Sequence, residues 1–182
     1  MKKTAIFASV LILLISGCSA EKNAIIPGAG SIGEYKGLIA DKEVAVVANQ
    51  TSMVGQEHLI EYLLSEGIDV KAIFAPEHGF RELAADGATI QNGRDPDTGI
   101  PVLSLYGNRV KPAPEDLDSI DVVLFDIQDV GVRFYTYLST LHYVMEACAE
   151  NNVKCIVLDR PNPNGFYTDG NICRCFRDSL RS

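Results

Sequence analysis

The sequence has little of three features that would each indicate a different class of protein: long apolar runs, basic residues and histidines. The apolar stretch from Ala5 to Ile15 has 11 residues, too few to span a bilayer as a helix. Lys and Arg number 16 against 24 Asp and Glu, a net charge of −8, so no basic surface for a nucleic-acid backbone is expected. Three histidines leave few ligands for a transition metal.

Cysteines are also few, and their spacing does not complete a zinc site. Of the five, Cys173 and Cys175 form one short pair without the second pair that zinc requires. Cys148 and Cys155 fall on an apolar helix and an apolar strand, where core packing is the simpler interpretation, although an oxidising compartment would permit a disulfide. The basic, aperiodic segment 171–182 is expected to be an aberrant, disordered tail.

The N-terminal residues have the pattern of a targeting segment. Lys2 and Lys3 precede the apolar stretch, and the four residues ending at Cys18 resemble a bacterial lipobox. That resemblance implies a signal peptide over 1–17 and lipidation of Cys18. We therefore expect an anchored lipoprotein of the cell envelope, on the outer membrane facing the periplasm, with 18–40 as anchor, linker and lead-in to a domain over 41–170.

A glycine pattern within the lead-in matches the dinucleotide-binding fingerprint. Gly28, Gly30 and Gly33 have the required spacing, but that fingerprint also needs a strand before it and a helix after it. Only three apolar residues and a proline precede Gly28, and Gly37 interrupts the segment after Gly33. We predict no nucleotide cofactor.

The domain shows an alternation of buried strands and amphipathic helices. Apolar, β-branched runs predict strands, and apolar residues at helical spacing predict helices. The resulting class is α/β, a doubly wound, mostly parallel Rossmann-like sheet of about five strands. The predicted strands are 44–48, 70–75, 102–106, 122–125 and 155–158; the predicted helices are 56–65, ended by Gly67, a short turn at 112–118, and one carrying Leu138, Leu141, Met145 and Cys148.

Clusters of ionisable and amide side chains follow four of these strands. In open α/β sheets ligands bind beyond the carboxyl ends of the strands, so the clusters should meet in one crevice. The clusters are 49–51, 77–81, 126–129 and 159–165.

Two of these clusters have the chemistry of a sugar-binding site. Glu77 follows Phe74 at a strand end, and partial burial there would raise the pKa of its carboxyl group, as a general acid requires. A surface pair of Glu77 with Arg81 is the alternative. The run from Phe125 to Tyr137 combines carboxylates, an amide, a guanidinium and phenols, which suit sugar hydroxyls and C–H faces.

Four segments together resemble the exo-β-N-acetylmuramidase family of peptidoglycan glycosidases, glycoside hydrolase family 171. They are 49–52, 74–81, 125–137 and 158–165, and the resemblance spans about Ile25 to Gly170. It implies a Rossmann-like N-terminal domain, a smaller C-terminal domain that this chain lacks, and release of terminal N-acetylmuramic acid from the non-reducing ends of peptidoglycan fragments. It implies no cofactor.

Carried onto this sequence, the resemblance assigns catalysis to Glu77, with His78 beside it. An arginine, Arg133 or Arg81, would bind the lactyl carboxylate of muramic acid through two parallel hydrogen bonds. The full set of candidate sugar-binding residues is Asn49, Gln50, Arg81, Asp126, Gln128, Asp129, Arg133, Tyr135, Tyr137, Asp159 and Asn162.

The mechanism and two other functions stay open from sequence. Asp126, Asp129 and Asp159 are each candidates for a second carboxylate, and the acetamido group of the substrate is the alternative nucleophile. A non-catalytic muropeptide-binding lipoprotein is the second function. A hydrolase that binds a hard cation through His78 and the three aspartates ranks last, because the other histidines, His58 and His142, fall on predicted helices.

Overall fold

The computed structural model describes residues 25–77, 79–81 and 92–167, and six strands of this part form one sheet. All neighbouring strands are parallel except the short β5, which pairs antiparallel with β6. The order across the sheet is β5-β6-β4-β1-β7-β8. The strands are β1 (Glu43–Ala48), β4 (Asp69–Ala75), β5 (Gly93–Arg94), β6 (Pro101–Ser104), β7 (Val122–Asp126) and β8 (Lys154–Val157).

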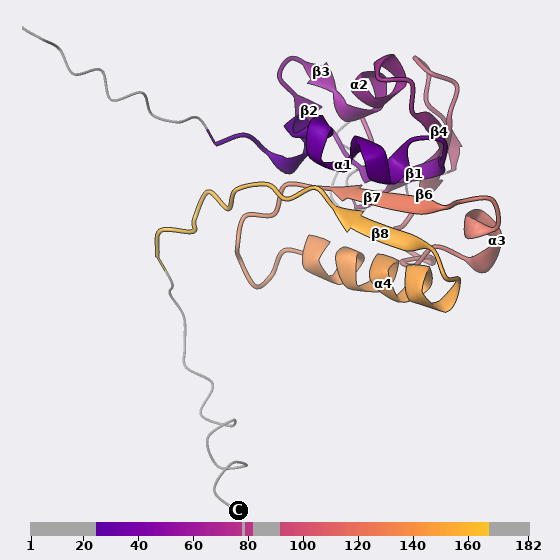
Figure 1. Cartoon of the computed structure of the whole chain (residues 1–182). Coiled ribbons are helices and arrows are strands. Elements are labelled where there is room, and N and C mark those ends of the chain that lie inside the picture. The colour runs from indigo at the N-terminus through magenta and orange to yellow at the C-terminus, as the bar shows by residue number, and fades with distance from the viewer. Residues whose placement is uncertain (1–24, 78, 82–91, 168–182) are drawn as a thin grey trace, which may run out of the picture.

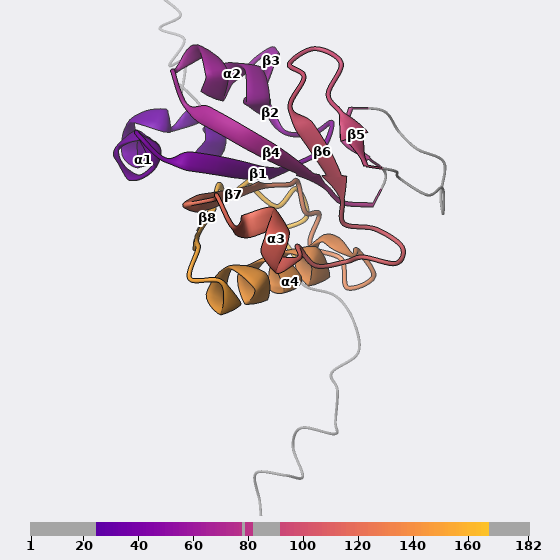
Figure 2. The ribbon, with the colours of Figure 1, turned by 90° about the vertical axis from the view of Figure 1, so that its right-hand side faces the viewer.

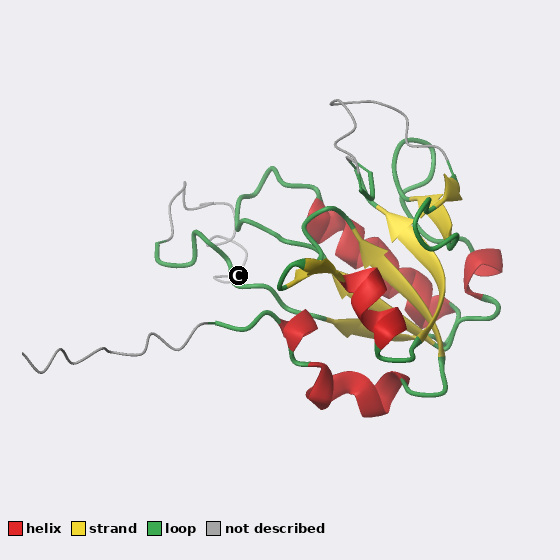
Figure 3. Ribbon diagram, turned by 90° about the horizontal axis from the view of Figure 1, so that it is seen from above, coloured by secondary structure: helices red, strands yellow, loops and turns green. Residues whose placement is uncertain are grey.

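Helices cover both faces of the sheet (Figures 1 and 2). One face carries the 3-10 turn η1 (Gly28–Gly30), α1 (Ile32–Ile39) and α2 (Leu59–Ser65). The other face carries α3 (Pro114–Leu117) and α4 (Tyr137–Glu150). Figure 3 shows the twisted strands between these helices. The predicted α/β class with a mostly parallel sheet is confirmed.

The strand order reverses between β1 and β7. From β1 the chain adds β4 and β6 on one side, then returns to place β7 and β8 on the other side of β1. In doubly wound sheets such a switch point leaves a crevice at the carboxyl ends of the two central strands. Ala48 pairs with Asp126 there, so the residues just after β1 and the last residue of β7 lie together at this point.

The helix predicted over 56–65 begins later, at Leu59. Residues 56–58 instead belong to an antiparallel hairpin of β2 (Met53–Val54) and β3 (Glu57–His58), with Gly55 in the turn at φ +63°. The end of α2 is as predicted, because Gly67 takes φ +79° and its N–H bonds to the Leu64 carbonyl.

Residues of the lead-in pack against the domain predicted over 41–170. Ala29, Tyr35 and Ile39 are buried in the same apolar core as β1 and α2. The Gly28 N–H donates to the Asp159 carbonyl at 2.7 Å, and a Cβ at Gly28 would lie 2.7 Å from the Asp159 nitrogen. The glycine therefore allows two backbones to approach each other, and its match to a nucleotide fingerprint has this structural reason.

The apolar face of α4 differs from the predicted stripe. Of the four stripe residues only Cys148 is fully buried, whereas Leu138 is 70% and Met145 52% exposed. Tyr137, Thr140, Val144 and Ala147 face the sheet with Cys148. The outer side of α4 therefore has apolar side chains that this domain leaves uncovered.

Several predictions fall outside the described residues. They concern the signal peptide over 1–17, lipidation of Cys18, the position of His78 and the tail at 171–182. Among the residues that the structure does describe, no helix is long and apolar enough to cross a membrane.

Candidate functional site

Asn49, directly after β1, is buried and holds the switch point together. Its Oδ1 accepts hydrogen bonds from the Thr51 N–H at 2.9 Å and the Thr51 hydroxyl at 2.6 Å. Its Nδ2 donates to the Tyr137 hydroxyl at 3.2 Å. Asn49 thus connects the end of β1 to the start of α4, and orients two hydroxyl groups of the site.

Glu77 lies half-buried after β4, next to the first residues of α4. Its Oε2 accepts a hydrogen bond from the Thr136 hydroxyl at 3.0 Å. Burial raises the pKa of the Tyr137 phenol, and the nearby charges of Tyr135 and Glu77 add to this effect. Asn49 and Glu77, which follow different strands, thus contact the adjacent residues Tyr137 and Thr136 at the start of α4.

Tyr135 and Arg133 lie at the outer rim of this group. The Tyr135 ring contacts the Tyr137 ring edge to face, with centroids 5.4 Å apart, and is 41% exposed. Arg133 is exposed and has no ion pair among the described residues. Both side chains can reach a ligand without breaking an existing contact.

Arg81 pairs with other carboxylates rather than with Glu77. It donates to Asp95 through Nε at 2.6 Å and Nη2 at 2.9 Å, and Nη2 also bonds to Glu61. Burial opposes ionisation of Asp95, but bonds from Arg81 and Thr98 lower its pKa below the usual range. Arg81 therefore connects the segment after Glu77 to α2 and to the residues after β5, through its Nε and Nη2 donors. Arg133 remains the freer guanidinium.

Asp126 is fully buried and forms a two-pronged ion pair with Arg160. The Arg160 Nε and Nη2 lie 2.6 and 2.8 Å from the two carboxylate oxygens, and Nη2 also donates to the Met53 carbonyl at 3.0 Å. Burial raises the pKa of Asp126, while the guanidinium opposes that shift. This ion pair connects the last residue of β7 to the loop after β8 at the edge of the candidate site. Arg160 was not among the predicted residues, although its Asp-Arg-Pro segment was.

The loops after β7 and β8 are joined by amide side chains. Gln128 donates to the Pro161 carbonyl at 3.0 Å, and Asn164 donates to the Val130 carbonyl at 2.9 Å. Asn162 packs against Gly131, where a Cβ would overlap its side chain. Gln128 and Asn162 thus shape the loops, and both remain at their rim.

Two predicted aspartates border a small cavity at the ends of β7 and β8. Its volume is about 100 Å³, and Asp129 and Asp159 line it with Tyr137 and Arg160. Asp129 also accepts the Gly131 N–H at 2.6 Å.

A buried oxygen of Gln50 has no hydrogen-bond partner among the described residues.

His58 is a site-supporting residue that the sequence did not single out. It is the N-cap of α2: its Nδ1 accepts the Ile60 N–H at 3.3 Å, which places the ring proton on Nε2, 2.9 Å from the Asn49 carbonyl. Burial lowers the pKa of His58, so the ring is neutral at neutral pH. The sequence places the start of this helix at residue 56, which would put His58 inside the helix. The N-cap role follows from the observed start of α2 at Leu59.

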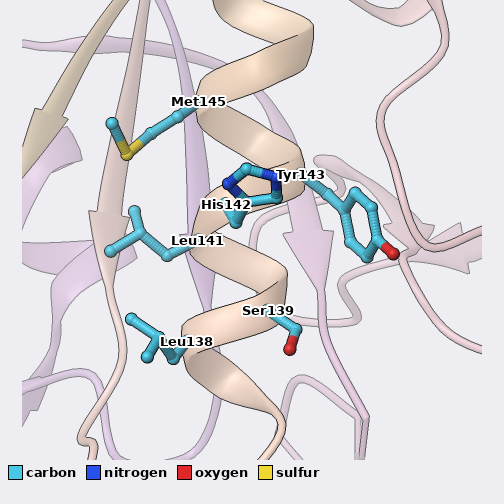
Figure 4. Close-up of a pocket in the computed structure, with 6 residues that line it drawn as sticks. All are labelled: Leu138, Ser139, Leu141, His142, Tyr143 and Met145. Carbon is cyan, nitrogen blue, oxygen red and sulfur yellow. The ribbon is translucent and has the colours of Figure 1, made fainter. Parts of the chain in front are cut away.

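Two other features bear on ligand chemistry. No group of three or more His, Cys, Asp or Glu suited to a metal exists among the described residues. A depression of about 420 Å³ lies on the outer side of α4, where Leu138, Leu141 and Met145 project to one side and Tyr143 to the other (Figure 4). It contains no carboxylate, so the strand ends are the better candidate for catalysis.

Comparison with known proteins identifies the family of this chain. A family model described as "Exo-beta-N-acetylmuramidase NamZ, N-terminal" matches residues 44–180. The chain is 44% identical over 134 residues to "Peptidoglycan beta-N-acetylmuramidase NamZ" of Bacillus subtilis (strain 168), a match that covers 72% of this chain and 32% of that protein.

Two crystal structures of DUF1343 family proteins from Bacteroides fragilis NCTC 9343 are also similar. One is 44% identical, with a TM-score of 0.69, over 83% of this chain and 39% of the other. The second is 39% identical, with a TM-score of 0.70, over 80% of this chain and 37% of the other. The chain thus spans about a third to two fifths of the length of these relatives. It belongs to the family of the N-terminal region of the exo-β-N-acetylmuramidase NamZ.

Proposed function

We propose that this chain carries the catalytic side of an exo-acting glycosidase that releases terminal N-acetylmuramic acid from the non-reducing ends of peptidoglycan fragments. The observation that carries the proposal is the position of Glu77 at the strand ends. It is held by the Thr136 hydroxyl beside Tyr137 and Asn49. The muramidase activity named for the B. subtilis relative supplies the substrate class.

Glu77 is the best placed carboxylate to act as the general acid. Asp126 is engaged at both oxygens by Arg160 and is fully buried, so it cannot exchange a proton with a sugar without breaking that pair. Glu77 is only half-buried and accepts a single described hydrogen bond. A carboxyl group so placed can protonate the leaving oxygen of a glycosidic bond.

The rim residues fit the other parts of a muramic acid. Arg133 can bind the lactyl carboxylate through two parallel hydrogen bonds, because its guanidinium has no ion pair among the described residues. The exposed ring of Tyr135 offers a flat apolar face for the sugar C–H groups. Asp129 and Asp159, at the small cavity, are the remaining candidates for hydroxyl contacts.

A chromogenic N-acetyl-β-muramide tests this assignment. Glu77→Gln should lower turnover by about 10²- to 10⁴-fold, the usual contribution of a general acid. The matched control is Glu57→Gln, an exposed carboxylate on β3, which should leave turnover unchanged. Undiminished turnover in Glu77→Gln would refute the catalytic role. Specific binding without turnover by the parent chain would favour a muropeptide-binding module, and loss of turnover with a chelator would favour a metal-dependent hydrolase.

We also propose that the protein is held at the cell envelope by a lipid on Cys18, facing the periplasm. The support is the lipobox-like Ile15-Ser16-Gly17-Cys18 sequence after a short apolar stretch. Metabolic labelling with a fatty acid should mark the protein, and Cys18→Ala should abolish the label. Labelling that persists in the variant would contradict the anchor.

A further inference from the structure

Two cysteines lie where α4 and β8 pack together. Cys148 lies in the last turns of α4 and Cys155 in the edge strand β8, and both belong to the apolar core between α4 and the sheet. Cys148 is buried in this cluster, Cys155 is packed against it, and neither cysteine is in a disulfide. The proposed glycosidase chemistry uses neither of them.

The backbone holds the two residues in place. The chain leaves α4, turns through Asn152 at φ +55°, and returns with the Val153 N–H bonded to the Cys148 carbonyl at 2.9 Å. Cys155 then pairs with Val123 of β7 in the sheet. Both ends of the short connection are therefore fixed by backbone hydrogen bonds, which keep the two cysteines on adjacent packed elements.

The two thiols differ in their access to solvent and in their acidity. Cys148 is 2% exposed, whereas Cys155 is half-buried on an edge strand with no neighbouring strand beyond it in the described sheet. The interaction between the two side chains lowers the pKa of Cys155, and together with burial it raises the pKa of Cys148. Cys155 is thus the thiol that an external reagent meets first.

We propose that Cys148 and Cys155 are a redox-active pair that closes to an intramolecular disulfide when the protein meets a disulfide oxidant. The Cys155 thiolate attacks a sulfur of the oxidant and forms a mixed disulfide, releasing one thiol. The Cys148 sulfur, losing its proton, then attacks the Cys155 sulfur and releases the second thiol. Two protein thiols are oxidised to one disulfide, and the oxidant disulfide is reduced to two thiols.

The disulfide would fasten the end of α4 to the edge of the sheet. Because α4 carries Tyr137 at its other end, the cross-link would stabilise the helix that positions the candidate site. The inference does not rest on the proposed glycosidase function, since it concerns only the packing of α4 on β8.

Differential alkylation after oxidation tests the proposal directly. The full chain is equilibrated with oxidised glutathione under native conditions. It is then unfolded in denaturant that contains N-ethylmaleimide, which alkylates the remaining free thiols, and is digested with trypsin and Asp-N. Cleavage after Lys154 and before Asp159 separates Cys148, Cys155 and Cys173 into different peptides. We expect a peptide pair linked through Cys148 and Cys155, two hydrogens lighter than the sum of its parts and free of maleimide.

Two variants complete the test. In Cys148→Ala, Cys155 should be recovered as a mixed disulfide with glutathione, whereas in Cys155→Ser the buried Cys148 should be recovered with maleimide. Oxidation should raise the melting temperature of the parent chain by several degrees and leave both variants unchanged. Maleimide on both cysteines of the oxidised parent, or linkage of Cys155 to Cys173 or Cys175, would overturn the proposal.

Discussion

Arg160→Met should destabilise the domain strongly, because it leaves a buried charge without its partner. Asp126 is fully buried, and Arg160 supplies both of its short charged hydrogen bonds. Removing one member of such a pair typically costs about 3–5 kcal/mol. For a domain of this size that loss lowers the melting temperature by roughly 6–20 °C.

The loss should depend on pH in a definite direction. Burial already raises the pKa of Asp126, and loss of the guanidinium removes the group that opposes the shift. A carboxyl with a raised folded pKa destabilises the fold above that pKa and ceases to do so when protonated. Arg160→Met should therefore recover stability, relative to the parent, as the pH falls from 7.5 towards 5.

Urea unfolding at both pH values measures this effect. Lys71→Met, which removes an exposed pair with Asp69, is the matched control and should leave the midpoint unchanged. Adding Asp126→Leu to Arg160→Met should recover much of the loss, because no buried charge then remains. If Arg160→Met lowers the free energy of unfolding no more than the control does, the Asp126–Arg160 pair does not stabilise the loop after β8 beside the site.

Three further predictions concern other contacts. Gly28→Ala should lower the free energy of unfolding by about 1–3 kcal/mol, because the new Cβ meets the Asp159 backbone. Gly37→Ala, in a helix with open space around it, should raise the free energy of unfolding by up to about 1 kcal/mol, and urea unfolding measures both. Burial lowers the pKa of His58 in the folded state, so the neutral ring contributes stability above pH 6.5, the pKa of the unfolded chain, and this contribution is lost as the pH falls below 6.5. His58→Gln should therefore make the free energy of unfolding depend less on pH in that range. Arg133→Met should raise KM for a muramide more than for a glucosaminide, which lacks the lactyl carboxylate, and equal changes would contradict its role.

The sheet could be predicted from sequence because its strands are buried on both faces. Runs such as 44–48 and 122–125 are continuous and apolar, and the structure extends each by one residue. The carboxyl-end rule predicts that the clusters 49–51 and 77–81 lie at one edge of the sheet, and Asn49 and Glu77 contact adjacent residues there. These inferences need only local pattern and the parallel topology.

Other features depend on contacts that local pattern does not contain. The β2–β3 hairpin has strands of two residues each, too short to show an alternation. Whether Arg81 binds substrate or Asp95 depends on a partner 14 residues away in a polar loop. The packing of the lead-in depends on distant partners, because Gly28 packs on Asp159 near the other end of the domain.

Chemical-shift mapping with N-acetylmuramic acid tests the central claim most directly. If the sugar binds where the strands end, backbone amides of 49–51, 77–81 and 126–136 should shift together, and N-acetylglucosamine should affect the 133 region less. Shifts confined to the outer side of α4, from Leu138 to Met145, would place the ligand away from Glu77 and contradict the account.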